Sequence, residues 1–244
     1  MTGQLSSELL KLRTTRTLAA IVLAGAGPTL LGTGIEGLSP TLGELGQEET
    51  QRSIFSAAGS TAVLFSTLAG LLMVTSEFRY GTIRPTLLFE PRRRVVLSAK
   101  LAAAALAGVL LAAVCEAIAF GAGSAILSAR EIDVALTATR LVGLIAGPII
   151  AAALGAMLGV AIGTLIRNQA AAIVALLGYA FAIDAVLFGA APSVGRFLPG
   201  KAGDALSGPP VHDLLTPGAG AVVLALWTLV FAAAALVRSD RSDV

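Results

Sequence analysis

The sequence predicts an all-α integral membrane protein in which six transmembrane helices form one domain over residues 1–244. Hydrophobic residues make up 56% of the chain and charged residues only 13%, whereas a soluble domain has about 25% charged residues. The apolar residues come in runs close to the roughly 20 residues that cross a bilayer core of about 30 Å. These runs lack strict polar alternation, so the spans are expected to be helices rather than strands of a barrel.

Residues 1–17 precede the first apolar run and are expected to form an amphipathic helix at the membrane surface. Leu5, Leu9 and Leu12 share one helical face, while the charged residues lie elsewhere. A charged signal-peptide leader is the alternative. Because no Ala-x-Ala-like cleavage site is followed by a soluble mature domain, the segment is interpreted as part of a retained signal anchor.

The other elements follow from the alternation of apolar runs with polar connections. The first run contains Pro28, which is expected to kink it. A very tight turn at 167–169 joins the fourth and fifth runs, and the longest Gly- and Pro-rich connection, 192–218, is expected to be an outer loop. The six expected spans are residues 18–34, 54–75, 95–120, 141–166, 170–191 and 219–237.

Six spans place both chain ends on the same side of the membrane, and the charges indicate which side. With the N-terminus inside, twelve of the 17 Lys and Arg lie in cytoplasmic segments. This bias agrees with the positive-inside rule. We therefore expect a protein of the inner (plasma) membrane with both chain ends on the cytoplasmic side. The cations left outside are Arg52, Arg130, Arg140, Arg196 and Lys201.

The densest polar stretch is residues 76–100, SEFRYGTIRPTLLFEPRRRVVLSAK, which holds six of the 17 Lys and Arg. Its first part, 76–94, is expected to be a cytoplasmic loop. Leu88 and Phe89 are apolar residues in this loop, which indicates docking on a membrane or a protein. The triple Arg at 92–94 has a plainer interpretation, because it can simply anchor the membrane boundary by reaching the headgroups.

The fourth span carries a small residue at every fourth position, which favours close helix packing of the GxxxG kind. At 3.6 residues per turn such a stripe winds around the helix and can serve two neighbours. Frequent Gly in membrane helices is the alternative explanation. The stripe consists of Gly143, Gly147, Ala151, Gly155, Gly159 and Gly163.

Two acidic residues, Glu116 and Asp184, lie inside apolar runs. A charge at mid-bilayer costs about 2.5–3.5 kcal/mol on insertion scales, so such residues usually face protein or a cavity. A substrate-cation contact or a proton site is one interpretation of this intramembrane polar pair. The other is an interhelical hydrogen bond, or a position close enough to the interface to reach water.

The sequence contains no motif for catalysis or for binding a cofactor. With one Cys (Cys115) and one His (His212), a His/Cys metal site within one chain is improbable. The pattern G-x-x-x-x-G-K-[ST] is absent, so the chain is not expected to hydrolyse nucleotide by itself. We therefore expect no enzyme activity in the chain alone, no cofactor or metal in it, and no nucleic-acid partner.

The polar stretch also carries a family resemblance. The run Glu77-Phe-Arg-Tyr-Gly81-Thr82-Ile, followed by Pro91, Arg94 and Lys100, resembles the E-x-x-x-G-T-(L/I)…P…R…K pattern of ABC-2-type permeases. The opening SELLKLRTTRT is similar to that family's N-terminal E-x-x-K-x-x-R segment, and six spans with both ends inside also match.

The resemblance implies a permease subunit of an ATP-driven exporter, in which two permease chains, identical or paralogous, pair with two separate ATPase subunits that bind ATP and Mg. It implies that the 76–94 loop holds a coupling helix for the ATPase, with Glu77, Arg79, Gly81 and Thr82 as contact candidates. Charge-assisted hydrogen bonds suit that contact, and Gly81 permits a sharp bend. The resemblance also implies that the 192–218 loop dips part-way into the membrane.

Other functions remain open from the residues alone. A proton-coupled secondary transporter would use Glu116 or Asp184 and would need no ATPase. A membrane enzyme is disfavoured, because no cluster of His, Cys or acids is present, and a non-transporting subunit of an ABC complex is a further alternative. The aliphatic spans favour an apolar or amphipathic cargo.

Overall fold

The computed structural model describes residues 2–208 and 211–241, and the described residues form helices joined by short connections. Six stretches within them are long and apolar enough to cross a membrane, which confirms a multi-pass helical membrane protein. The helices are α1 (Thr2–Thr14), α2 (Arg16–Leu38), α3 (Leu42–Leu45), α4 (Glu48–Ser56), α5 (Gly59–Tyr80), α6 (Ile83–Phe89), α7 (Arg93–Ala129), α8 (Ala138–Ile166), α9 (Gln169–Gly178), the π-helix η1 (Tyr179–Ile183), α10 (Asp184–Ala190), α11 (Pro192–Gly195), α12 (Pro199–Ser207) and α13 (Pro217–Arg241).

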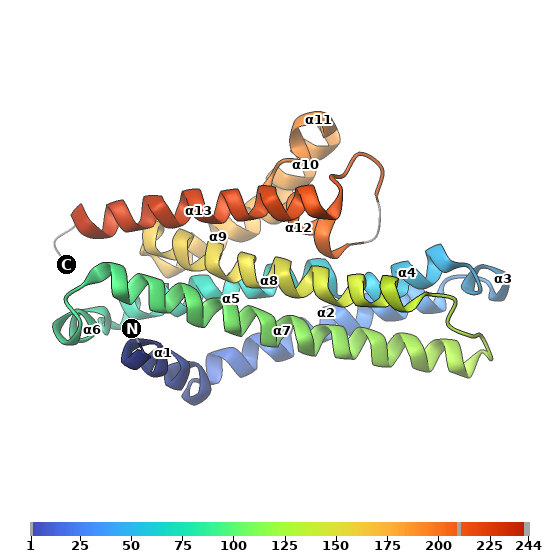
Figure 1. The fold of residues 1–244 in the computed structure, drawn as a ribbon, viewed down its shortest axis with the longest axis horizontal. Helices are drawn as coiled ribbons and strands as arrows, with labels where there is room; N and C mark the ends of the chain where they lie inside the picture. The colour runs from blue at the N-terminus through green and yellow to red at the C-terminus, as the bar shows by residue number, and fades with distance from the viewer. Residues whose placement is uncertain (1, 209–210, 242–244) are drawn as a thin grey trace.

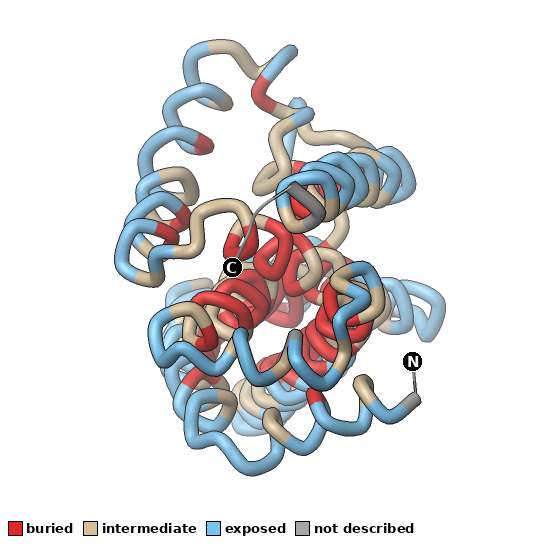
Figure 2. The backbone as a smooth tube through the Cα atoms, turned by 90° about the vertical axis from the view of Figure 1, so that its left-hand side faces the viewer, coloured by how far each residue is buried: buried red, intermediate tan, exposed pale blue. Residues whose placement is uncertain are grey.

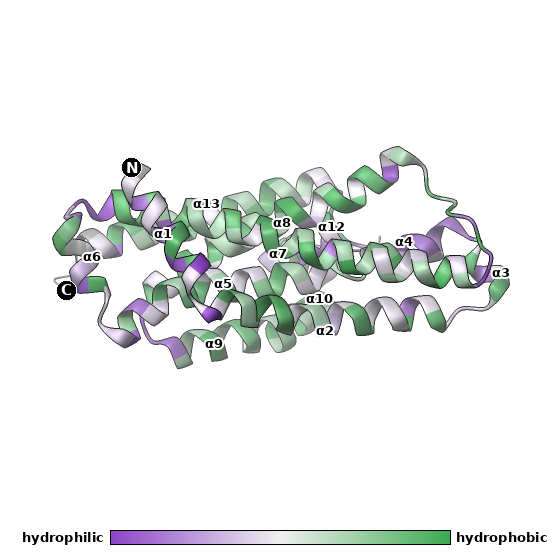
Figure 3. Ribbon diagram, turned by 90° about the horizontal axis from the view of Figure 1, so that it is seen from below, coloured by the Kyte–Doolittle hydropathy of each residue, from purple (hydrophilic) through white to green (hydrophobic). Residues whose placement is uncertain are grey.

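The helices lie side by side as an elongated bundle (Figure 1). The helix α6 lies at one end, together with α1 and the C-terminal end of α13, and we call this the α6 end. The short helices α3 and α4 lie toward the opposite end. Hydrophobic residues cover the length of the bundle, and hydrophilic residues gather mainly toward its ends (Figure 3).

The core of the bundle is formed by α5, α7 and α8, and the outer faces of the surrounding helices are exposed (Figure 2). Small residues dominate this core, including Ala104, Ala112, Ala152 and Ala156, which are fully buried. Small side chains let helix backbones approach closely, which is how helices associate in lipid without a hydrophobic driving force between them.

One helix and one connection differ from the elements expected from the sequence. The helix α7 continues to Ala129, nine residues past the expected end at 120, because Leu127 is buried among residues of α4 and α8. Its 37 residues measure about 55 Å at 1.5 Å per residue, more than a bilayer core of about 30 Å. The expected outer loop 192–218 contains α11 and α12, and α12 packs against α8 and α13 with Ala202 and Ser207 buried.

The glycine stripe of α8 faces two neighbours, α5 and α12, over most of its length. Close approach there needs glycine, because an added Cβ would overlap atoms of the neighbouring helix. Gly143 is the exception, since nothing lies within 4 Å of the added atom. The added Cβ would lie 2.1 Å from the Leu206 oxygen at Gly147, 2.7 Å from the Thr67 hydroxyl at Gly155, 2.0 Å from the Thr67 carbonyl at Gly159 and 2.9 Å from the Leu71 carbonyl at Gly163.

Candidate functional site

A cluster of four charged side chains, three of them buried, joins three helices at the α6 end. The Lys100 ammonium on α7 lies 2.6 Å from Glu77 Oε1 on α5 and 3.0 Å from Glu8 Oε2 on α1. Lys11 on α1 bridges the same two carboxylates, at 2.8 Å from each. Glu8 and Lys100 are each 2% exposed and Glu77 is 6% exposed. We call these four residues the α6-end ion cluster.

Pairing is what makes the burial of these charges tolerable. An isolated buried charge costs several kcal/mol, and attraction to a close partner offsets that cost only when the geometry is good. Burial alone would lower the pKa of the Lys11 ammonium, but its hydrogen bonds to Glu77 and Glu8 outweigh this and raise the pKa above its ordinary value. Two carboxylates and two ammonium groups balance, so the cluster fastens α1 to α5 and α7 without a net charge.

The cluster also shows how α1 meets the bundle. The expected amphipathic segment is helical, but the buried residue on it is Glu8, whereas Leu9 and Leu10 are exposed. A cavity of about 420 Å³ lies beside the cluster, between α1, α2 and α5. The helix is therefore held by charge pairing on one face and presents leucines on another.

The four predicted coupling residues do not share one surface. Glu77 and Arg79 belong to the last turn of α5, where Glu77 points into the ion cluster and Arg79 is exposed. Arg79 donates a 3.2 Å hydrogen bond to the side chain of Gln169. Gly81 ends the helix with φ of 71°, the left-handed conformation that glycine adopts without strain. The next residue, Thr82, is exposed. Of the four predicted coupling residues, Glu77 is buried, and only the three that follow it are accessible to a partner.

The helix α6 follows directly and exposes two large apolar side chains. Leu88 is 85% exposed and Phe89 is 92% exposed. The following helix begins at Arg93, within the arginine triplet, and Arg93 donates a hydrogen bond to the main-chain oxygen of Ser239 on α13. The 76–94 segment is thus a helix end, a glycine turn and a short apolar helix, held at both sides to the bundle.

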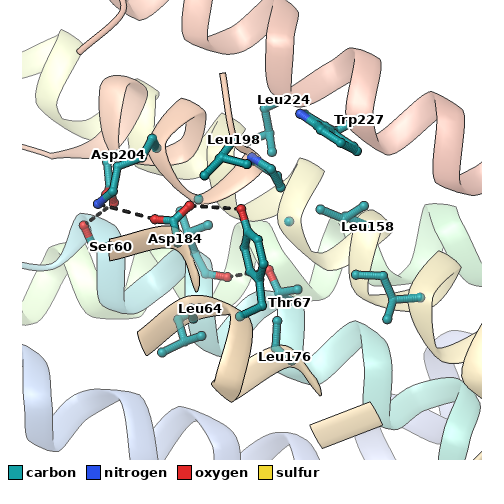
Figure 4. A pocket seen from close by; sticks show the side chains of 18 of the residues that line it. Ser60, Leu64, Thr67, Leu158, Leu176, Asp184, Leu198, Asp204, Leu224 and Trp227 are labelled. Atoms are coloured by element: carbon teal, nitrogen blue, oxygen red, sulfur yellow. Dashed lines mark hydrogen bonds and ion pairs between the residues drawn. The ribbon is translucent and has the colours of Figure 1, made fainter. Parts of the chain in front are cut away.

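A second polar cluster lies away from the α6 end, around Asp184 (Figure 4). Asp184 accepts a 2.9 Å hydrogen bond from the Tyr179 hydroxyl, and its other oxygen lies 3.4 Å from the Lys201 ammonium. Lys201 pairs more closely with Asp204, at 2.8 Å, and the Ser60 hydroxyl donates to Asp204 at 2.8 Å. The cluster joins α5, η1, α10 and α12, and we call these five residues the Asp184 cluster.

Local backbone geometry builds the Asp184 cluster. The π-helix η1 widens one turn, so that the residue five positions before Asp184 lies on the same face and its hydroxyl reaches the carboxylate. Single π-turns within α-helices occur frequently at functional sites. On the opposite side, α12 begins so close to α10 that a Cβ at Gly200 would lie 2.6 Å from Asp184 Oδ1. A larger residue at that position would require the Asp184 carboxylate to move.

The Asp184 cluster forms the polar end of a cavity of about 430 Å³ (Figure 4). This volume falls within the roughly 300–1,000 Å³ typical of small-molecule sites. Trp227 lines the cavity and donates its indole N–H to the Phe197 carbonyl at 2.9 Å. The apolar lining comes from α5, α8, α9, η1, α12 and α13, and includes Leu64, Leu158, Ile162, Leu176, Phe181, Leu198, Leu224 and Phe231.

Glu116, the other predicted intramembrane acid, is not part of this cavity. It is buried on α7, and neither carboxyl oxygen has a hydrogen-bond partner among the described residues. Asp184 is buried too, but it accepts a hydrogen bond from Tyr179 and lies near the Lys201 ammonium. The structure therefore separates two residues that look alike in the sequence.

Sequence reasoning missed three of the residues around Asp184. Tyr179, Lys201 and Asp204 carried no motif, and only the spacing of Lys201 and Asp204, three residues apart, hinted at a local pair. The approach of this pair to Asp184 depends on how α12 packs. The role of Lys100 was missed for the same reason, because its partners lie 23 and 92 residues away.

Other classes of site find no support in the described part of the chain. No group of three or more His, Cys, Asp or Glu side chains there is placed to hold a metal ion. Comparison with models of known protein families gives no match, and comparison with characterised protein sequences finds no similar protein. The two charged clusters, the cavity and the exposed α6 are therefore the features of this protein that bear on its function.

Proposed function

We propose that this chain is the permease subunit of an ATP-driven ABC exporter, working with separate ATPase subunits and a second permease chain. The observation that carries the proposal is α6, a short apolar helix exposed at one end of a membrane bundle and held there by a glycine turn and a buried ion cluster. An exposed apolar patch of this kind marks a protein or membrane contact. The partner would bind ATP and Mg, since the chain has no nucleotide-binding motif.

The proposal assigns the α6 end to the cytoplasm of a cell's plasma membrane. The arginine triplet, α1 and both chain ends then lie inside, in agreement with the positive-inside distribution of twelve of the 17 cations. In this orientation α1 lies at the inner membrane surface, where Leu9 and Leu10 face the acyl chains. The segment 192–218, with α12 packed among the spans, lies on the outer side.

A single helix connects the proposed coupling element to the cavity. The 22 residues of α5 span about 33 Å at 1.5 Å per residue. Its last turn contributes Glu77 to the ion cluster, and its first turns contribute Ser60, Leu64 and Thr67 to the cavity lining. Closure of the ATPase pair would displace α6, and the ion cluster would pass that displacement to α5 and α7. Transport then follows from a different affinity for cargo in the two states.

Replacing both Leu88 and Phe89 with alanine tests the proposed contact. Truncating an interface hot spot costs about 2 kcal/mol or more, so we expect at least a 30-fold loss of associated ATPase. The measurement is ATP hydrolysis and subunit composition of the chain purified from its native membranes. The matched control is Leu42→Ala, which removes another exposed leucine at the other end of the bundle and should change neither.

Two outcomes would contradict the proposal in different ways. Wild-type protein that carries no ATP-hydrolysing subunit would exclude the ABC assignment. A double variant that retains the subunit at wild-type level would exclude α6 as the contact while leaving the assignment in place.

The proton-coupled alternative finds support in Glu116, whose carboxyl group is buried and has no hydrogen-bond partner in the described part of the chain. Glutamine is close in shape to a protonated glutamic acid and needs no charge partner. If Glu116 is neutral and structural, Glu116→Gln should change the thermal midpoint of the purified protein by less than about 2 °C, equivalent to under 1 kcal/mol for a chain of this size. A larger loss of stability, or transport that continues in membranes without any ATPase, would favour the alternative.

A further inference from the structure

The cavity at the Asp184 cluster has one charged end and an apolar remainder. We propose that it binds an amphipathic organic cation, with the aliphatic part against α8 and α13 and the cationic head at Asp184 and Asp204. The inference rests on the proposed export function only for the ligand's role as cargo. Binding itself needs no ATPase, and it can be measured on this chain alone.

Charge balance selects the sign of the ligand. Two carboxylates, Asp184 and Asp204, face a single ammonium group, Lys201, so the polar end of the cavity has an excess of negative charge. Lys201 lies 0.6 Å closer to Asp204, at 2.8 Å, than to Asp184, at 3.4 Å. The two carboxylates share one ammonium group, and a second cation would complete the pairing. An anion would meet repulsion there.

Hydrogen-bonding capacity indicates the same class of ligand. The hydroxyls of Tyr179 and Ser60 both donate inward, to Asp184 and Asp204, so they are already used. An ionised carboxylate offers about four acceptor positions, and each of these two has only two partners in the described structure. The unused acceptor positions of these two carboxylates can take further hydrogen-bond donors or a cation.

The remainder of the cavity suits an apolar body. Leu158, Ile162 and Leu176 supply an aliphatic wall, and Trp227 and Phe231 supply aromatic faces 5.8 Å apart. A charged head on an aliphatic chain would satisfy both parts of the cavity together.

The chain contains a built-in reporter for this site, because Trp227 is its only tryptophan. The full chain, in nanodiscs of zwitterionic lipid, would be titrated with three brominated amphiphiles of equal chain length: an ω-bromododecyl trimethylammonium, the alcohol and the carboxylate. We expect saturable quenching of Trp227 by the ammonium at a concentration at least ten-fold lower than for the other two. Unbrominated dodecyl trimethylammonium should reverse it.

Two variants that change the charge of the site in opposite directions distinguish recognition of the ligand's charge from misfolding. Asp204→Asn removes the excess negative charge and should weaken ammonium binding at least ten-fold. Lys201→Gln removes the resident cation and should strengthen it several-fold, because both carboxylates then face the ligand. Asp204 is preferred to the fully buried Asp184 for this purpose, since it is partly exposed and its replacement disturbs less packing.

The control moves the reporter to the lipid face of the same helix. In the double variant that combines Trp227→Phe with Leu229→Trp, the indole lies on the opposite side of α13, where Leu229 is exposed. There it senses only probe dissolved in the bilayer. Its quenching should rise without saturation and show no charge preference.

Equal quenching by all three probes, or quenching in the wild type that does not saturate, would overturn the inference. A shift of binding in the same direction by both charge variants would overturn it as well. None of these outcomes depends on an ATPase, so they leave the ABC assignment untouched. Conversely, a chain that purifies without ATPase can still bind the cation.

Discussion

Gly159→Ala should strongly destabilise the protein, although it adds only one methyl group. The new Cβ would lie 2.0 Å from the Thr67 carbonyl oxygen and 2.9 Å from the Leu71 nitrogen, so α5 and α8 must move apart. Overpacking typically costs 1–3 kcal/mol, and the upper end, about 3 kcal/mol, is expected against rigid backbone. The thermal midpoint of the purified protein in detergent should fall by roughly 10 °C.

Gly143→Ala is the matched control, in the same helix and with the same added atom. Nothing lies within 4 Å of that atom, and alanine favours a helix over glycine by about 1 kcal/mol. The midpoint should stay unchanged or rise slightly. Equal midpoints for the two variants would mean that α8 does not pack on α5 through its glycine stripe.

Lys100→Met should be the most damaging charge substitution in the chain. It leaves Glu8 and Glu77 buried with only Lys11 to balance them. Removing one partner of a buried ion pair costs about 3–5 kcal/mol, because an uncompensated charge remains. We expect a fall in thermal midpoint of on the order of 10 °C, and faster tryptic cleavage after Lys11 and Arg13 as α1 is released from the bundle.

Two further variants show whether charge or packing causes the loss. In Glu77→Gln/Lys100→Met the remaining pair, Glu8 and Lys11, is balanced, so this double variant should be more stable than Lys100→Met alone. Lys11→Met should cost only about 1 kcal/mol, since the Lys11 side chain is 41% exposed and solvent screens it. A double variant as unstable as the single one would show that Lys100 acts through packing.

The destabilisation also bears on how coupling is tested. Glu77 is part of the family-like motif, but its side chain holds the ion cluster together. Glu77→Ala would therefore weaken the contacts among α1, α5 and α7, whether or not Glu77 contacts a partner. Leu88 and Phe89 offer a cleaner test, because their exposed side chains can be truncated without disturbing the bundle.

The sequence by itself determined the class of the protein, its helical spans and where its polar residues interrupt them. Hydropathy is a local property, because any run of about 20 apolar residues must form a helix to satisfy its backbone in lipid. The turn at Gly81 was also predictable, since the left-handed conformation that ends α5, with φ of 71°, is the one that glycine favours.

Only the tertiary structure decided which way the special residues face. Spacing alone could not separate Gly159, which touches backbone, from Gly143, which faces open space, since both belong to one stripe. Asp184 has Tyr179 and Lys201 beside it, whereas Glu116 has no hydrogen-bonding neighbour among the described residues. Whether a small residue meets backbone, or an acid meets a cation, depends on which helices are neighbours, and that pairing is a property of the packed bundle.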